Sequence, residues 1–211
     1  GNPDLWRAAF NSFYVAIIGC VLGLIGTCVA AYPMAYGNFY GKKLYVIIIM
    51  FTMWFNAGIV PLFLTIRQLG LYDSLWALIL NSMITAYNVV IIRSYFSSIP
   101  FSVIESARID GAGKMRTLVE ILFPLVKPGI VAVCIYTFLN AWDDYMMSLI
   151  IMQDASMKTL PVGIAETFLG EYCYNYGGMM AFAVIGSLPI VLLFIFLQKH
   201  MIAGLTAGAV K

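Results

Sequence analysis

Apolar residues lie along this chain in long runs. Five segments each hold about 20 mostly apolar residues, the length that crosses a bilayer core of about 30 Å as a helix. Runs such as VIIIMFTMWF lack the alternation of apolar and polar residues that marks a membrane-spanning strand. The pattern therefore predicts an all-α, polytopic transmembrane helical bundle, with spans at about 8–32, 44–65, 74–92, 129–151 and 178–198.

Composition supports lipid as the surrounding solvent. The chain is 62% hydrophobic and only 10% charged, whereas a soluble domain carries about 25% charged residues. We therefore expect residues 1–211 to form a single transmembrane domain. His200 is the only histidine, and the four cysteines lack metal-ligand spacing, so a metal site or a histidine-based catalytic triad is not expected.

The distribution of Lys and Arg predicts the orientation. If the segment after the first span is cytoplasmic, nine of the twelve Lys and Arg residues fall inside and three fall outside. The C-terminus is then inside and residue 1 outside. Five spans with an outside start, in a chain that opens with Gly, lead us to expect that a sixth, N-terminal span is missing from this sequence.

The longest polar segment on the predicted inside runs over about 97–128, and we call it the amphipathic loop. A short helix is expected from near Pro100, with Ser102 and Glu105 at capping-box spacing. Gly111 and Gly113 supply a turn. The second helix then has one apolar stripe, made by Met115, Leu118, Val119 and Leu122. Arg116 and Glu120 form a supporting i,i+4 charge pair on the same helix.

Periodicity alone leaves two uses open for this loop. It can lie on lipid headgroups, or it can dock into a groove on a cytosolic partner. It is not expected to bind a nucleotide itself. Gly113-Lys114 is followed by Met115 instead of the Ser or Thr of a phosphate-binding loop, and Arg108 stands where the first glycine is needed.

The loop resembles the EAA loop of ABC importer permeases. The resemblance lies in the run ESARIDGAG from Glu105, followed by ILFP and a second proline at Pro128. Ser106 replaces the first alanine of the family pattern, and Phe123 replaces the leucine before proline. The segments LNAWDDY, TLPVGIA and GLTAGAVK are similar to the carbohydrate-uptake, maltose-type branch, so the resemblance covers most of the chain.

This resemblance implies a multi-pass permease of the bacterial plasma membrane that is not an enzyme. Its partners would be a second, different permease subunit, two cytosolic ATPase subunits that bind ATP and Mg²⁺, and an extracytoplasmic solute-binding protein, which meets the segment 153–177. The chain itself would hold no cofactor. The residues implied to couple ATP hydrolysis to transport are Glu105, Ser106, Ala107, Asp110, Gly111 and Ala112.

Two acids inside the fourth expected span are candidates for a solute path. A carboxylate facing lipid is costly, so Asp143 and Asp144 should face water, a solute or a partner helix. On a continuous helix they share a face with Asn140 and Met147, flanked by Trp142 and Tyr145. Sugar hydroxyls would donate to the acids, and rings would stack on the sugar. Alternatively, the acids cap a broken helix or bond to the partner permease.

Other polar residues of the spans are weaker candidates for the same path. Asn81, Thr85 and Asn88 share a face if the third span is one helix, and Asn56 lies near Gly58 and Pro61, which predict an interruption of the second span. For each of them alone, a packing hydrogen bond is the favoured explanation. The leading hypothesis is the import of a saccharide or similar polar solute. The alternatives are an intramembrane enzyme using the two acids, and a secondary transporter with an aspartate as its proton site.

Overall fold

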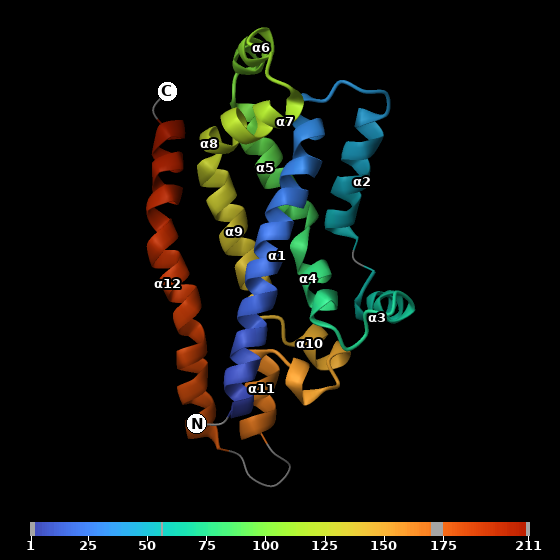
Figure 1. Ribbon diagram of the computed structural model, residues 1–211, viewed down its shortest axis with the longest axis vertical. Coiled ribbons are helices and arrows are strands. Elements are labelled where there is room, and N and C mark those ends of the chain that lie inside the picture. The colour runs from blue at the N-terminus through green and yellow to red at the C-terminus, as the bar shows by residue number, and fades with distance from the viewer. Residues whose placement is uncertain (1–2, 56, 170–174, 210–211) are drawn as a thin grey trace. The chain divides into compact units, whose positions relative to one another are not determined.

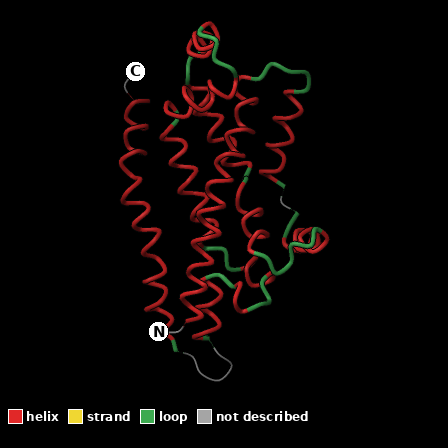
Figure 2. The backbone as a smooth tube through the Cα atoms, in the orientation of Figure 1, coloured by secondary structure: helices red, strands yellow, loops and turns green. Residues whose placement is uncertain are grey.

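The computed structural model describes residues 3–55, 57–169 and 175–209, with side chains for all of these except 108 and 199–209. Helices joined by loops and turns make up this part of the chain (Figure 2), which confirms the all-α prediction. In chain order (Figure 1) they are α1 (Pro3–Tyr36), α2 (Lys42–Trp54), α3 (Ile59–Gln68), α4 (Leu75–Met83), α5 (Ala86–Ser98), α6 (Phe101–Ile109), α7 (Lys114–Arg116), the π-helix η1 (Thr117–Leu122), α8 (Phe123–Leu125), α9 (Lys127–Trp142), α10 (Met146–Ile151), the 3-10 helix η2 (Ala155–Met157), α11 (Leu160–Phe168) and α12 (Tyr176–Ala209).

The first and fifth expected spans are long helices. In the described chain, α1 and the Tyr176–Gln198 part of α12 are each long and apolar enough to cross a bilayer, and the count reaches five if each of three bent helix pairs is one span. The number of spans therefore remains a prediction. The second expected span is interrupted as anticipated, because α2 ends at Trp54 and α3 begins after Gly58, whose φ is +86°.

The third and fourth expected spans are not the continuous helices that we predicted. Ile84 and Thr85 separate α4 from α5, and the Thr85 hydroxyl accepts a hydrogen bond from the Asn88 amide, as an N-cap does. Residues 143–145 separate α9 from α10. Both breaks lie inside apolar runs. At each break a polar side chain accepts a hydrogen bond from a backbone amide at the start of the next helix, which has no carbonyl partner within that helix.

The chain divides into two compact units, each with its own apolar core. The first comprises Gly1–Leu22, Ala57–Met83 and Ile135–Phe196. Its buried residues come from α1, α3, α4, α9, α10 and α11, and include Val15, Leu78, Ile79, Trp142 and Ile151.

The second unit comprises Gly23–Asn56, Ile84–Cys134 and Leu197–Lys211. Its core joins the last turns of α1 to α5 and to the amphipathic loop. Phe96 is fully buried between Tyr32 and Tyr36, and the Tyr36 hydroxyl donates to the Phe96 carbonyl. From the loop, Ile104, Leu118 and Leu122 enter the same core. The amphipathic loop is therefore packed on this unit through part of its apolar surface.

Candidate functional site

The first helix of the amphipathic loop, α6, packs through one side. Ile104 and Ala107 are buried at 0% and 4% exposure, while Glu105 and Ser106 are exposed. The alanine of the motif is thus a packing position. The expected capping box is wrong, because α6 begins at Phe101 and Ser102 lies inside its first turn rather than before it.

A glycine turn ends α6. The Asp110 amide donates to the Ser106 carbonyl, and the Ala112 amide donates to the Ala107 carbonyl over 2.9 Å. The second bond closes the wide loop of a Schellman motif, which requires a left-handed residue after the helix. Gly111 supplies it, with φ +78°. The predicted role of this glycine as the turn residue is confirmed, whereas its part in coupling remains a prediction.

The second helix of the loop departs from the expected single stripe. Residues Thr117–Leu122 form a π-helix, and the wider turn separates the four apolar side chains. Leu118 and Leu122 are buried, whereas Met115 and Val119 are 67% and 55% exposed. The prediction of one stripe is wrong because it assumed 3.6 residues per turn.

The expected charge pair of this helix is present. Arg116 and Glu120 are joined over 2.7 Å, and both side chains are exposed. An exposed pair of this kind adds little to the stability of a fold, because water screens it. The unusual feature of the loop surface is therefore its exposed apolar side chains. Ile109, at the end of α6, is 85% exposed, and Phe101 at its start is 48% exposed.

The two acids of the candidate solute path have different surroundings. Because α9 ends at Trp142, the predicted helix face shared with Asn140 and Met147 is wrong. Asp144 is half-buried and accepts a hydrogen bond from the Met147 amide over 3.1 Å at the start of α10. It therefore has the helix-capping position that we kept as the alternative. Asp143 is exposed and lines a cavity of about 290 Å³ beside α11 and α12.

Trp142 is an anchor of the first unit. Its side chain is 3% exposed, and its indole Nε1 donates to the Gly186 carbonyl of α12 over 3.0 Å. Its ring stacks on Phe138 at 5.6 Å between centroids and meets Phe13 edge-on at 4.6 Å. A ring held in this way offers little free surface for stacking on a solute. Trp142 nevertheless lines the same cavity as Asp143, and its part in the solute path remains a prediction.

The remaining path candidates are distributed over both units. Asn140 is exposed, and its amide donates to the Tyr136 carbonyl on the same helix; Tyr145 is 37% exposed. Asn81 belongs to the first unit and the fully buried Asn88 to the second. Their shared helix face with Thr85 is wrong because Thr85 lies between α4 and α5. Asn56 lies outside the described residues.

Sequence reasoning missed Ser187 and Pro161, which line the cavity with Asp143. Ser187 lies on α12 and Pro161 begins α11, so no spacing in the sequence relates them to the acid. Among the described residues, no group of three or more His, Cys, Asp or Glu side chains gathers in a way that fits a metal ion.

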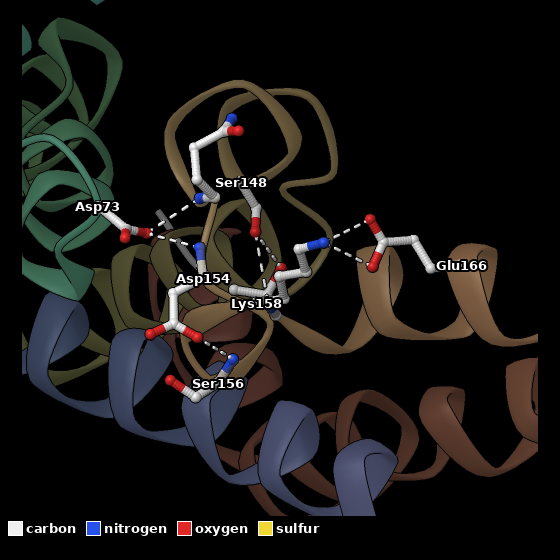
Figure 3. Close-up of polar contacts among 8 residues, drawn as sticks. Asp73, Ser148, Asp154, Ser156, Lys158 and Glu166 are labelled. Carbon is white, nitrogen blue, oxygen red and sulfur yellow. Dashed lines mark hydrogen bonds and ion pairs between the residues drawn. The ribbon is translucent and has the colours of Figure 1, made fainter.

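A polar network around residues 152–159, the α10–α11 loop, was also missed (Figure 3). Asp154 accepts a bond from the Ser156 amide, which holds the pKa of this exposed carboxyl below its ordinary value. This contribution to loop order is present at neutral pH and is lost as pH falls through the lowered pKa. Lys158 pairs with Glu166 at 2.6 Å.

Comparison with known proteins places these features in a family. Residues 12–206 match the family model described as "binding-protein-dependent transport system inner membrane component". The chain belongs to this family. The match includes both the amphipathic loop and the two acids, and it agrees with the permease class that the EAA-like run indicated.

Individual relatives agree. The chain is 33% identical to the arabinooligosaccharides transport system permease protein AraQ of Halalkalibacterium halodurans, over 98% of the chain and 74% of the relative. It is 34% identical to the sulfoquinovosyl glycerol transport system permease protein SmoH of Agrobacterium fabrum, over 96% and 72%. A solved bacterial ABC transporter involved in the import of alginate matches with a TM-score of 0.87 and 27% identity, over 94% of this chain and 76% of that one.

Family membership decides between the functions that the residues alone left open. This permease is a membrane-embedded component of an ABC importer, and the prediction that it is not itself an enzyme follows from that class. The intramembrane enzyme loses support as well, because Asp144 accepts a bond from the Met147 amide, whereas Asp143 lines a cavity to which Asp144 does not contribute. A proton-coupled carrier has no support from the family.

Proposed function

We propose that this permease forms half of a two-permease pore that imports a saccharide, with ATP and Mg²⁺ bound only by two cytosolic ATPase subunits. A glycosidic cargo is supported by the names of two relatives, an arabinooligosaccharides permease and a sulfoquinovosyl glycerol permease, and by the similar alginate importer. The second permease is a different chain, and a solute-binding protein delivers the cargo outside. The C-terminus is inside, in agreement with the excess of Lys and Arg on that side.

The observation that carries the proposal is the exposure of apolar side chains around the glycine turn. Ile109, Met115 and Val119 are 85%, 67% and 55% exposed, next to the exposed polar residues of α6. Exposed apolar side chains beside polar ones are typical of protein or membrane interaction sites, and the transport-system family favours a protein partner. We therefore assign the loop to an ATPase groove, with Glu105, Ser106, Ala107, Asp110, Gly111 and Ala112 as its coupling residues.

The proposed function is tested by reconstituting the permease in lipid nanodiscs with the partner permease, ATPase and binding protein encoded beside it. We expect ATP hydrolysis to rise when the solute-loaded binding protein is added, and uptake into liposomes to require ATP. Uptake that proceeds with no ATPase subunit in the membrane would refute the importer assignment. Candidate solutes are neutral and acidic oligosaccharides, and a free amino acid serves as the unrelated cargo.

Docking of the loop predicts a specific effect at Ile109. Ile109→Asp should reduce the ATPase subunit recovered with the affinity-purified permease by at least about tenfold, because burying an unpaired carboxylate in an interface costs several kcal/mol. Because the side chain is 85% exposed, the permease itself should remain folded. Leu69→Asp is the matched control, since Leu69 is 67% exposed at the end of α3, far along the chain from the loop. Equal recovery with both variants would contradict docking at this surface.

For the solute path, Asp143→Asn should slow uptake by about tenfold, the loss expected when a hydroxyl no longer donates to a charged acceptor. Uptake is measured with radiolabelled cargo, and assembly is checked by co-purification. Asp144→Asn is the control, because the amide oxygen of Asn still accepts the Met147 bond and keeps α10 capped. Normal uptake by Asp143→Asn would leave Asp143 with a structural role only.

A further inference from the structure

The α10–α11 loop is shaped by side chains from outside it. Asn11 of α1, which is 7% exposed, donates to the carbonyls of Ser156 and Lys158 over 2.8 and 3.0 Å. Its neighbour Ser12 accepts from the Leu160 amide over 2.8 Å. All three bonds use the backbone of the loop or of the helix that follows it, so they fix its path whatever its own side chains are.

Asp73 fixes the other end of this loop. One carboxylate oxygen accepts hydrogen bonds from two consecutive amides, those of Gln153 at 2.9 Å and Asp154 at 3.1 Å (Figure 3). The Asp73 amide in turn donates to the Ile151 carbonyl. Asp73 belongs to the connection between α3 and α4, some 80 residues earlier in the chain. It therefore ties two connections of the same unit together, and bonds to a charged acceptor are the stronger kind.

The backbone at Asp73 is adapted to this contact. Its φ is +56°, and it is the one residue other than glycine with a positive φ in the described chain. Asn and Asp tolerate this conformation better than other residues with a Cβ. A left-handed residue that also bonds two amides holds a conformation that costs backbone energy, and such positions cluster at functional sites.

The loop that Asp73 holds has an outward surface. Gln153, Asp154 and Ala155 are exposed, although the backbone of the loop is tied down by residues beneath it. Under the proposed topology, the α3–α4 connection and the α10–α11 loop both lie on the side where solute is delivered. A surface already held in its bound shape binds a partner more tightly, because less order has to be created on binding.

We propose that Asp73 is a positioning residue that holds the α10–α11 loop ready for the solute-binding protein. This inference rests on the proposed function. Loss of the clamp should raise the concentration of loaded binding protein that gives half-maximal ATPase stimulation. Basal hydrolysis and the maximal stimulated rate should stay unchanged, because Asp73 contacts neither the amphipathic loop nor the acids of the solute path in any bond described above.

The test compares Asp73→Gly with Asp73→Asn in the complete importer in nanodiscs. Glycine accepts the positive φ but removes both hydrogen bonds, whereas Asn keeps an acceptor oxygen and tolerates the same φ. We expect the half-maximal concentration to rise about tenfold for glycine and less than about twofold for Asn. Glu166→Gln is the comparison variant, because it breaks the ion pair that Lys158 makes in the same loop and leaves both Asp73 bonds in place.

Amide hydrogen exchange gives a readout that does not depend on transport. In Asp73→Gly, exchange at Gln153 and Asp154 should accelerate by about tenfold, while Asn should protect them. Absence of stimulation in the unsubstituted complex would refute the proposed function and leave this measurement valid. Unchanged exchange and unchanged half-maximal concentration in Asp73→Gly would overturn the role of Asp73, as would an Asn variant that behaves like glycine. If Asp73→Gly does not assemble, Asp73→Ser, whose side chain is too short to bridge both amides, replaces it.

Discussion

Gly111→Pro is expected to abolish solute-stimulated ATP hydrolysis, reducing it by well over tenfold while the permease still inserts and assembles. The φ of Gly111 is +78°, and proline is fixed near −65°. The chain cannot form the Schellman turn that ends α6 with proline there, so Ile109 and Met115 lose the arrangement proposed to enter the ATPase. Stimulated hydrolysis of the reconstituted complex is the measurement, with co-purification as the check on assembly.

Gly113→Ala is the matched control for this turn. Gly113 has φ −68°, and a Cβ added there meets no atom within 4 Å, so hydrolysis should be normal. Gly111→Ala should be intermediate, because the left-handed conformation costs an ordinary residue about 1–2 kcal/mol and a Cβ at this glycine also meets nothing within 4 Å. A Gly111→Pro variant with full stimulated hydrolysis would show that the turn is not required for coupling.

Trp142→Ala is expected to destabilise the permease by about 3–5 kcal/mol, the range for removing a large aromatic side chain from a core. The indole is 3% exposed and joins α9 to α12 through the Gly186 carbonyl, so its loss removes packing against Phe13 and Phe138 as well. The midpoint of thermal unfolding in detergent, followed by tryptophan fluorescence or light scattering, reports the change.

Two further variants separate the contributions of Trp142. Trp142→Phe keeps a ring but lacks the N–H donor, and should cost only about 1–2 kcal/mol. Trp54→Ala removes the same side chain from a position that is 79% exposed, and should leave the midpoint nearly unchanged. Should Trp142→Ala unfold at the same temperature as Trp54→Ala, Trp142 would not be the anchor that its contacts indicate.

The fold class could be predicted because membrane insertion demands long apolar runs. The interruption of the second span was predictable too, because Gly58 and Pro61 both disfavour a continuous helix. The break at Ile84 and Thr85 was not, because both residues are ordinary in a membrane helix and hydropathy does not register a change of hydrogen-bond partner. The same limit hid the end of α9 before Asp143.

The candidate sites were predicted unevenly for the same reason. The turn at Gly111 follows from local chemistry, and the structure has it where the motif predicted. Which side chains of the second helix are buried depends on the π-helix, for which the sequence carries no signal that we recognised. The burial of Trp142 depends on Gly186, 44 residues further on, and the clamp at Asp73 depends on a loop 80 residues away. Tertiary neighbours at such separations are not encoded in any local pattern.

The length of α1 has a consequence for where its aromatic end lies. Its 34 residues span about 51 Å at 1.5 Å per residue, whereas the hydrocarbon core is about 30 Å thick. If α1 runs along the bilayer normal, roughly 20 Å of it stands among headgroups or in water, and tilt reduces this length. Tyr32 and Tyr36, in its final turns, then occupy the interfacial layer that tyrosine prefers. Because both tyrosines pack against the core of the second unit, they anchor that core next to the membrane interface.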